Sequence, residues 1–120
     1  MKIERFGDLI AWRKSKELAL AVYRVTGAGA FSRDFGLRDQ VQRAAVSVMS
    51  NIAEGFERYS RPEFKQFLSV ARGSVAEVRS QLYLARELNY LSADQHTALH
   101  NLCLDVSRLL GALRSSLERA

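Results

Sequence analysis

The sequence predicts an all-α protein, an antiparallel bundle of four helices with up-down-up-down connections. Apolar residues recur every three or four positions over four segments, two Ser-x-x-Glu/Gln patterns mark helix starts, and the 120 residues include one proline. A β-sheet protein would need turn residues at intervals of roughly 8–12 positions. With 48% hydrophobic residues, residues 1–120 suit a single domain with an ordinary core.

The first helix is expected from Asp8 to Thr26, with Asp8 as its N-cap. Its predicted buried side consists of Leu9, Trp12, Leu18, Val22 and Val25. Residues 27–34 follow as the longest predicted loop, because the Gly-Ala-Gly-Ala run cannot sustain a helix at normal cost.

The second helix is expected from Asp34 to Gly55, since glycine suits the left-handed position that often ends a helix. Its apolar stripe is Leu37, Val41, Ala45, Val48 and Ile52, and a polar stripe beside it is Gln40, Ser47, Asn51, Glu54 and Arg58. Glu54 lies near the helix C-terminus, where the macrodipole disfavours anions. Either Arg58, four residues on, or a cation from another helix must therefore compensate its charge. Residues 57–60 form the next link.

The third helix is expected from Ser60 to about Leu88. Ser60 and Glu63 match a capping box, and Pro62 falls in the first turn, where a missing N–H costs nothing. Its apolar residues step by four and three, as in a helix packed along its whole length: Phe64, Leu68, Ala71, Val75, Val78, Leu82 and Ala85.

Residues 89–91 predict a tight connection to a fourth helix, which begins with a second capping box at Ser92 and Gln95. The matching apolar stripe is Leu99, Leu102, Val106, Leu109 and Leu113. Further apolar residues widen this stripe, namely Cys103, Leu104, Leu110 and Leu117. A stripe of this width indicates apolar surface beyond the needs of one bundle, and hence self-association.

Four cations of the third helix repeat every seventh residue: Lys65, Arg72, Arg79 and Arg86, here called the basic ridge. At 1.5 Å per residue they extend over roughly 30 Å beside the apolar stripe. None has an acidic residue three or four positions away. Their counter-charges must come from another helix, another subunit or an external anion.

The formal net charge is +5, and 14 of the 18 cationic residues are Arg, whose planar fork suits both phosphate and buried ion pairs. Two interpretations of the ridge stay open. It pairs with acids between helices or subunits, for which Glu77, Glu87, Asp105 and Glu118 are candidates. Alternatively it binds RNA or DNA without base specificity, with Arg13, Lys14 and Lys16 of the first helix extending the basic surface.

Catalysis and cofactors find no support in the sequence, which carries no nucleophile elbow or phosphate loop. His96, His100 and Cys103 share one side of the fourth helix and are residue types that bind zinc. A fourth ligand is absent, however, and Cys103 falls in the apolar stripe. We therefore expect no enzyme, no cofactor and no metal site, with both histidines on the outer half-turn and Cys103 as a small buried hydrophobe.

Cys103 is the only cysteine, so no internal disulfide can form and an oxidising compartment is not indicated. Residues 1–5 lack the apolar region of a signal peptide, and no segment has the ~20 apolar residues that span a bilayer. A cytoplasmic location without membrane insertion is expected.

Several strings resemble the small four-helix-bundle proteins encoded in intervening sequences of bacterial 23S ribosomal RNA genes. They are Phe6 to Lys14, Gly36-Leu37, Gln40, Arg43 to Ser47, Ser50 to Gly55, Phe67-Leu68, Ala71, Gly73-Ser74, Glu77 and Gln81-Leu82. The Ser-Asn-Ile-Ala-Glu-Gly string, with Ser50, Asn51, Glu54 and Gly55 as its structural motif, is fairly specific when followed by Gly73-Ser74 and Glu77 of the third helix.

This resemblance implies homopentameric barrels of four-helix protomers. It extends to the accessory variability-determinant proteins of diversity-generating retroelements, which are similar basic barrels that bind nucleic acid and a reverse transcriptase. Two function classes follow: a nucleic-acid-binding accessory protein, and an oligomeric scaffold whose partner is another protein.

Overall fold

The four segments with periodic apolar residues form four long helices. The computed structural model describes residues 3–118 and consists of α1 (Ile10–Thr26), α2 (Phe35–Phe56), α3 (Arg61–Glu87), α4 (Ala93–Glu118) and two short 3-10 helices, η1 (Phe6–Asp8) and η2 (Gly29–Arg33). No strand occurs in this described range. The all-α prediction is confirmed.

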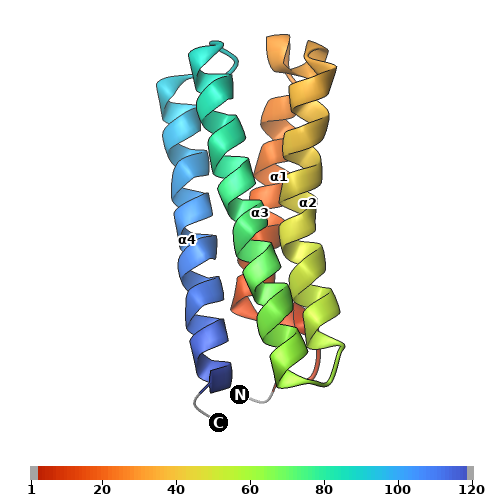
Figure 1. The fold of residues 1–120 in the computed structure, drawn as a ribbon. Helices are drawn as coiled ribbons and strands as arrows, with labels where there is room; N and C mark the ends of the chain where they lie inside the picture. Colours follow the sequence, from red (N-terminus) through yellow and green to blue (C-terminus); the bar gives the residue numbers. More distant parts are fainter. Residues whose placement is uncertain (1–2, 119–120) are drawn as a thin grey trace.

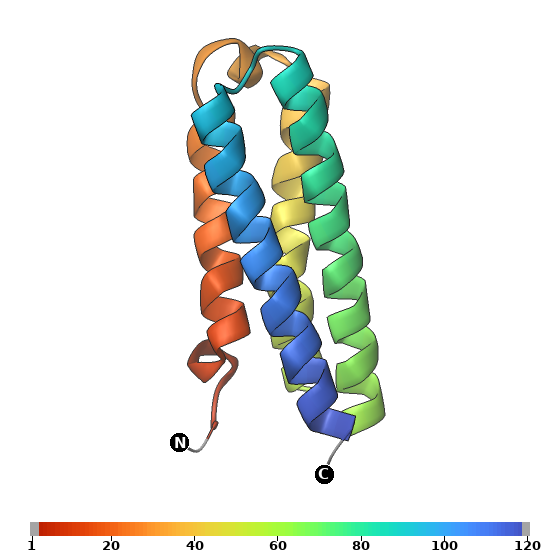
Figure 2. The same cartoon turned by 90° about the vertical axis from the view of Figure 1, so that its left-hand side faces the viewer.

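The helices form an up-down-up-down bundle of 47 × 22 × 20 Å (Figure 1). The α1–α2 and α3–α4 connections lie at one end, and the α2–α3 connection lies at the other. Figure 2 shows α4 between α1 and α3, so α4 packs against both. Helices α2 and α3 share the largest interface, and α1 lies diagonally across the bundle from α3.

The core is built from the predicted stripes. Every residue assigned to the four stripes is either buried or packs, half-buried, against the buried cluster. The third and fourth helices begin as expected, because Ser60 Oγ accepts from Glu63 N at 3.4 Å and Ser92 and Gln95 exchange both capping-box bonds at 2.9 and 3.1 Å.

The start of the first helix differs from expectation. Helix α1 begins at Ile10 with Leu9 at its N-cap, and Asp8 ends the preceding 3-10 turn. The carboxylate of Asp8 accepts from the backbone N of Glu4 and Arg5 at 3.4 and 3.3 Å, so it faces back along the chain. An Asp side chain can cap either of two neighbouring turns, and the sequence alone does not show which of them it caps.

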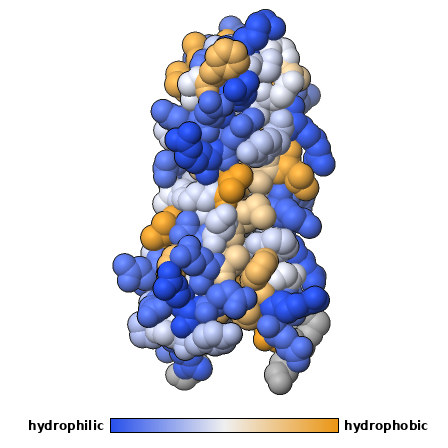
Figure 3. Space-filling model, turned by 90° about the vertical axis from the view of Figure 1, so that its right-hand side faces the viewer, coloured by the Kyte–Doolittle hydropathy of each residue, from blue (hydrophilic) through white to orange (hydrophobic). Residues whose placement is uncertain are grey.

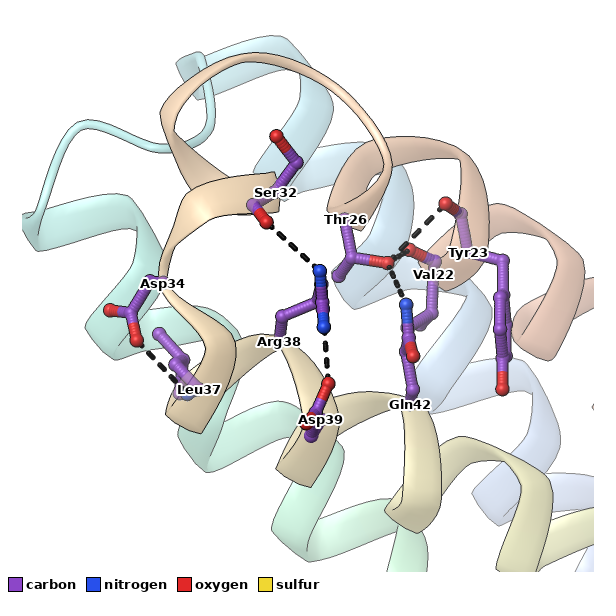
Figure 4. A network of polar contacts seen from close by, with 9 residues as sticks. All are labelled: Val22, Tyr23, Thr26, Ser32, Asp34, Leu37, Arg38, Asp39 and Gln42. Atoms are coloured by element: carbon purple, nitrogen blue, oxygen red, sulfur yellow. Dashed lines mark hydrogen bonds and ion pairs between the residues drawn. The ribbon is translucent and has the colours of Figure 1, made fainter.

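The predicted loop at residues 27–34 contains the 3-10 helix η2, and polar contacts join it to its neighbours (Figure 4). Gln42 of α2 donates to Thr26 Oγ1 at 2.9 Å, and Arg38 donates to the Ser32 carbonyl at 3.0 Å. Phe31 of η2 is fully buried and stacks on Tyr90 of the α3–α4 connection, with ring centroids 5.2 Å apart. Both connections at this end are therefore tied together.

Most of the apolar residues that widen the stripe of α4 pack inside the bundle. The expectation that they form surplus apolar surface is therefore corrected. Cys103 and Leu110 are buried, Leu117 packs half-buried against the core, and Leu104 stays 42% exposed. The apolar face of α4 is divided between two neighbours, since α4 contacts both α3 and α1.

The face on the side of α2 is mostly hydrophilic, and hydrophobic and neutral residues form a narrow line along it (Figure 3). Within residues 3–118, no helix combines the length and apolar character required to cross a membrane.

Candidate nucleic-acid interface

The basic ridge lies along the contact between α3 and α4. Each of its residues has a neighbour on α4, in antiparallel order. Lys65 Nζ is 3.4 Å from Glu118 Oε1, and Arg72 Nη1 is 3.9 Å from where a Cβ on Gly111 would lie. Farther along, Arg79 acts electrostatically on Cys103, and Arg86 acts on His96. A single α3 edge thus carries all four cations beside α4, and we call it the α3–α4 face.

At one end of this face the ion-pair interpretation holds. Glu118 Oε1 accepts from Arg114 Nη1 at 2.9 Å and also pairs with Lys65. Arg114 further donates through Nε to Ser69 of α3 at 3.1 Å. Two cations share one carboxylate, so even this end is electropositive.

The other three ridge residues form no ion pair with any residue in the described range. Arg72 is exposed, and Arg79 and Arg86 are half-buried. The Nε of Arg79 is buried and has no hydrogen-bond partner among residues 3–118. Of the expected acidic partners only Glu118 pairs with the ridge, whereas Asp105 pairs with Arg108 of its own helix at 3.4 Å.

Titratable groups beneath the ridge show its local electrostatics. Burial raises the pKa of the Cys103 thiol to about 12, although the charge of Arg79 opposes the rise. The pKa of His96 is lowered, first by burial and then by the positive charges of His100 and Arg86. Cys103 is therefore a neutral, unreactive thiol, as expected of a small buried hydrophobe.

One residue of this face was not predicted from the sequence. Tyr83 of α3 is 51% exposed, and its ring centroid lies 4.9 Å from that of His96 and 5.8 Å from that of His100. Its position, four residues after Arg79 and three before Arg86, already places it on the ridge side of the helix. That spacing is the signal that could have identified it.

The two histidines and Cys103 point to different surroundings. His96 and His100 lie half-buried with their rings tilted or edge-on to that of Tyr83, while Cys103 belongs to the core. The part of the chain that the structure describes holds no group of three or more metal-ligating side chains.

The first-helix cations lie elsewhere and make local contacts. Arg13 Nε donates to the Gly7 carbonyl at 2.8 Å, and Lys14 pairs with Glu17 at 3.3 Å. Lys16 Nζ lies 5.4 Å from the centroid of the Trp12 ring. Since α1 is diagonal to α3, these cations do not continue the ridge directly, and their role in binding stays a prediction.

Two residues of the structural motif of α2, Asn51 and Gly55, lie toward α3 instead. Asn51 Nδ2 donates to the carbonyl and to Oγ of Ser47 at 2.8 and 3.0 Å, and Ser47 Oγ is 3.0 Å from Ser74 Oγ of α3. The link from Asn51 to the neighbouring helix is thus indirect. Ser50 is exposed.

Glu54 and Gly55 complete this motif. Of the two partners considered for Glu54, the structure has Arg58, 3.0 Å away on the same helix. The prediction that Gly55 ends the helix in a left-handed conformation is wrong, because α2 continues to Phe56 and Gly55 is helical and buried. A Cβ on Gly55 would lie 2.6 Å from Phe67 Cβ, so the glycine permits close approach of α3.

Comparison with known families now identifies the chain's relatives. Residues 7–112 match the model of the 23S rRNA-intervening sequence protein family. The chain belongs to this family. The match includes the basic ridge, Tyr83 and the α2 motif, so all of these lie within the family's domain.

A solved structure of the S23 ribosomal protein family has the same fold. It is a crystal structure of a protein of unknown function from Bacteroides thetaiotaomicron, with a TM-score of 0.80 and 23% sequence identity, covering 88% of this chain and 98% of that one. At this identity the likeness establishes the four-helix fold alone. Among curated proteins, none is significantly similar to the chain.

Proposed function

We propose that the protein is a non-enzymatic, nucleic-acid-binding accessory protein, and that its α3–α4 face contacts the phosphate backbone. One observation carries the proposal: Arg72, Arg79 and Arg86 lie on one face of α3 with no acidic partner in the described range. Arg79 and Arg86 are half-buried, and partly buried cations without a counter-charge are costly, a cost that an external polyanion removes.

The residue types and their spacing suit phosphate. An Arg guanidinium donates to phosphate through a planar fork and stays charged at any physiological pH. Successive ridge residues are separated by about 10.5 Å of helix, close to three 3.4 Å steps of a stacked strand. Such contacts fix position without reading sequence, so we expect similar affinity for unrelated sequences.

We further propose that the protein is a homo-oligomer, with five subunits favoured by the family resemblance. Assembly would repeat the ridge around an axis and multiply the +5 charge of one chain. Light scattering tests this part: the 13.5 kDa mass of one chain at micromolar concentration would contradict it.

An oligomeric scaffold without a nucleic-acid role is the second candidate. Three exposed apolar residues support it, since Val70, Leu84 and Leu88 are 49%, 50% and 45% exposed. They share one side of α3, because fourteen and eighteen residues are close to four and five helical turns. Leu84 and Leu88, one helical turn apart, place two exposed apolar side chains next to each other, which favours a protein contact.

Two finer proposals rest on the resemblance to retroelement accessory proteins alone. The protein partner would be a reverse transcriptase, and the complex would act in the cytoplasm. Co-purification of the two proteins after co-expression tests the partnership, provided that the complex survives nuclease treatment.

A salt titration of binding tests the main proposal. Protein of measured mass is titrated with unrelated RNA and DNA sequences at several salt concentrations. Backbone binding predicts affinity that falls linearly with log salt and varies little with sequence. No binding to any of these nucleic acids at low salt would contradict the nucleic-acid role and favour the scaffold.

A further inference from the structure

An exposed aromatic ring stands among the arginines of the α3–α4 face. Tyr83 follows Arg79 by four residues and precedes Arg86 by three, so its Cα lies about 6 Å and 4.5 Å from theirs along the helix axis. His96 and His100 of α4 lie on one side of the ring, at centroid distances of 4.9 and 5.8 Å. The two imidazoles are 5.9 Å apart, so both lie within reach of the same ring.

The surroundings of Tyr83 leave its ring accessible. Half of the residue is exposed. Arginines elsewhere stack on aromatic rings, such as Arg38 over Phe35 at 4.7 Å and Arg58 over Phe67 at 5.1 Å. Neither Arg79 nor Arg86 covers Tyr83 in this way in the described structure, so ring and cations are separately available to one ligand.

We infer that Tyr83 stacks on a base of single-stranded nucleic acid whose phosphates lie on Arg79 and Arg86. This inference rests on the proposed function and names the form of nucleic acid that the site prefers. Grooves for single strands combine cations that follow the backbone with aromatic rings on which bases stack. In a duplex both faces of an internal base are already stacked, so Tyr83 can add nothing to duplex binding.

The test compares variants on single-stranded and duplex probes. Tyr83→Leu removes the ring and keeps an apolar side chain, Tyr83→Phe keeps the ring, and Tyr23→Leu is the matched control on α1, since Tyr23 is 48% exposed. The probes are oligo-dT and oligo-U of about 15 nucleotides, long enough for a ridge of roughly 30 Å, and a DNA duplex of equal length.

Tyr83→Leu should weaken single-strand binding about 5- to 150-fold, the equivalent of ~1–3 kcal/mol per stacked base. Duplex affinity should stay unchanged, and Tyr83→Phe and Tyr23→Leu should bind like the parent. Loss with both oligo-dT and oligo-U supports stacking on either nucleic acid. Loss with only one supports stacking and names that nucleic acid.

A second variant gives a direct optical signal if Tyr83→Leu folds poorly. Tyr83→Trp should bind single strands at least as tightly as the parent. Compared with the parent, whose fluorescence comes from Trp12, it should show additional quenching by oligo-dT or oligo-U but not by the duplex. Unchanged binding by Tyr83→Leu, equal loss on duplex and single strand, or no selective quenching would overturn the inference and leave backbone binding intact. If the parent binds no probe at all, the proposed function itself fails.

Discussion

The two edges of α3 meet their neighbours in opposite ways. On the α2 edge, neutral polar side chains pair across the helices, as Ser74 does with Ser47 at 3.0 Å and Gln81 with Gln40 at 3.4 Å. Oε1 of Gln81 is buried without a partner, but this group is neutral. On the α4 edge, three arginines meet no acid in the described chain. The α2 edge is thus an internal contact between neutral groups, whereas the α4 edge carries positive charges that no acidic side chain of the described residues balances.

The contrast suggests a division of roles along α3, in which the α2 edge stabilises the bundle and the α4 edge carries the proposed binding surface. Small residues let α2 and α3 approach closely, and Gly55 is the extreme case. Long cations on the other edge reach past small residues of α4, as Arg72 does over Gly111. Their aliphatic stems can cover apolar surface while their charges stay available. Mutations on the α2 edge should therefore alter stability, and mutations on the α4 edge should alter binding.

Gly55→Ala should produce the largest stability effect. The new Cβ would lie 2.6 Å from Phe67 Cβ and 3.0 Å from Phe64 Cδ1, so α2 and α3 must move apart. Overpacking of this kind destabilises by about 1–3 kcal/mol. Urea unfolding measures the effect. Gly73→Ala is the control, since no atom lies within 4 Å of its new Cβ, and it should stabilise α3 by about 0.5–1 kcal/mol. Equal effects of both variants would contradict close packing at Gly55.

Asn51→Ala should have a smaller effect, about 1 kcal/mol of lost stability. The Ser47 hydroxyl keeps its partner Ser74 when Asn51 is removed, so the desolvation penalty of an unpaired group is limited. Ser50→Ala, on the exposed side of the same helix, should change stability by less than ~0.5 kcal/mol. A loss above ~3 kcal/mol for Asn51→Ala would show that Asn51 does more than bond to Ser47.

The smallest effect is a pH dependence at the α4 edge. Because the pKa of His96 is lowered in the folded protein, the unfolded chain binds its proton more readily. The ordinary pKa of histidine is about 6.5. As the pH falls below this value, His96 therefore reduces the stability of the folded protein, and at higher pH it has no such effect. His96→Gln should show a smaller loss of stability between pH 7.5 and 5.5 than the parent. Identical pH profiles of parent and variant would contradict the shift.

The fold was largely predictable from the sequence because helix spacing and caps are local signals. Ser60, Ser92 and Asp34 all cap helices near the expected positions. The two wrong assignments, Asp8 and Gly55, depend on which segment packs next to the residue. Asp8 could cap either of two turns, and Gly55 could either end α2 or allow α3 to pack closely against it, so the sequence alone does not decide between them.

The site was predictable in part for the same reason. Seven-residue spacing placed the four cations on one edge of α3, but it could not show that only Lys65 finds an acid, Glu118. Tyr83 was missed because an exposed aromatic residue gives no periodic signal of its own. Its significance appears only when α4 brings His96 and His100 beside it.

A salt titration of the double variant Arg72→Gln/Arg79→Gln tests whether the α3–α4 face binds nucleic acid. Arg24→Gln/Arg43→Gln is the matched control, since both residues are exposed and neither pairs with an acid in the described range. The ridge variant should lose affinity equally for unrelated sequences, and its slope of log affinity against log salt should flatten by ~0.7–0.9 for each contact removed. The control should keep most of its affinity, with mass and stability unchanged in both proteins. Unchanged affinity and slope in the ridge variant at unchanged mass would contradict the assignment of the α3–α4 face as the nucleic-acid interface.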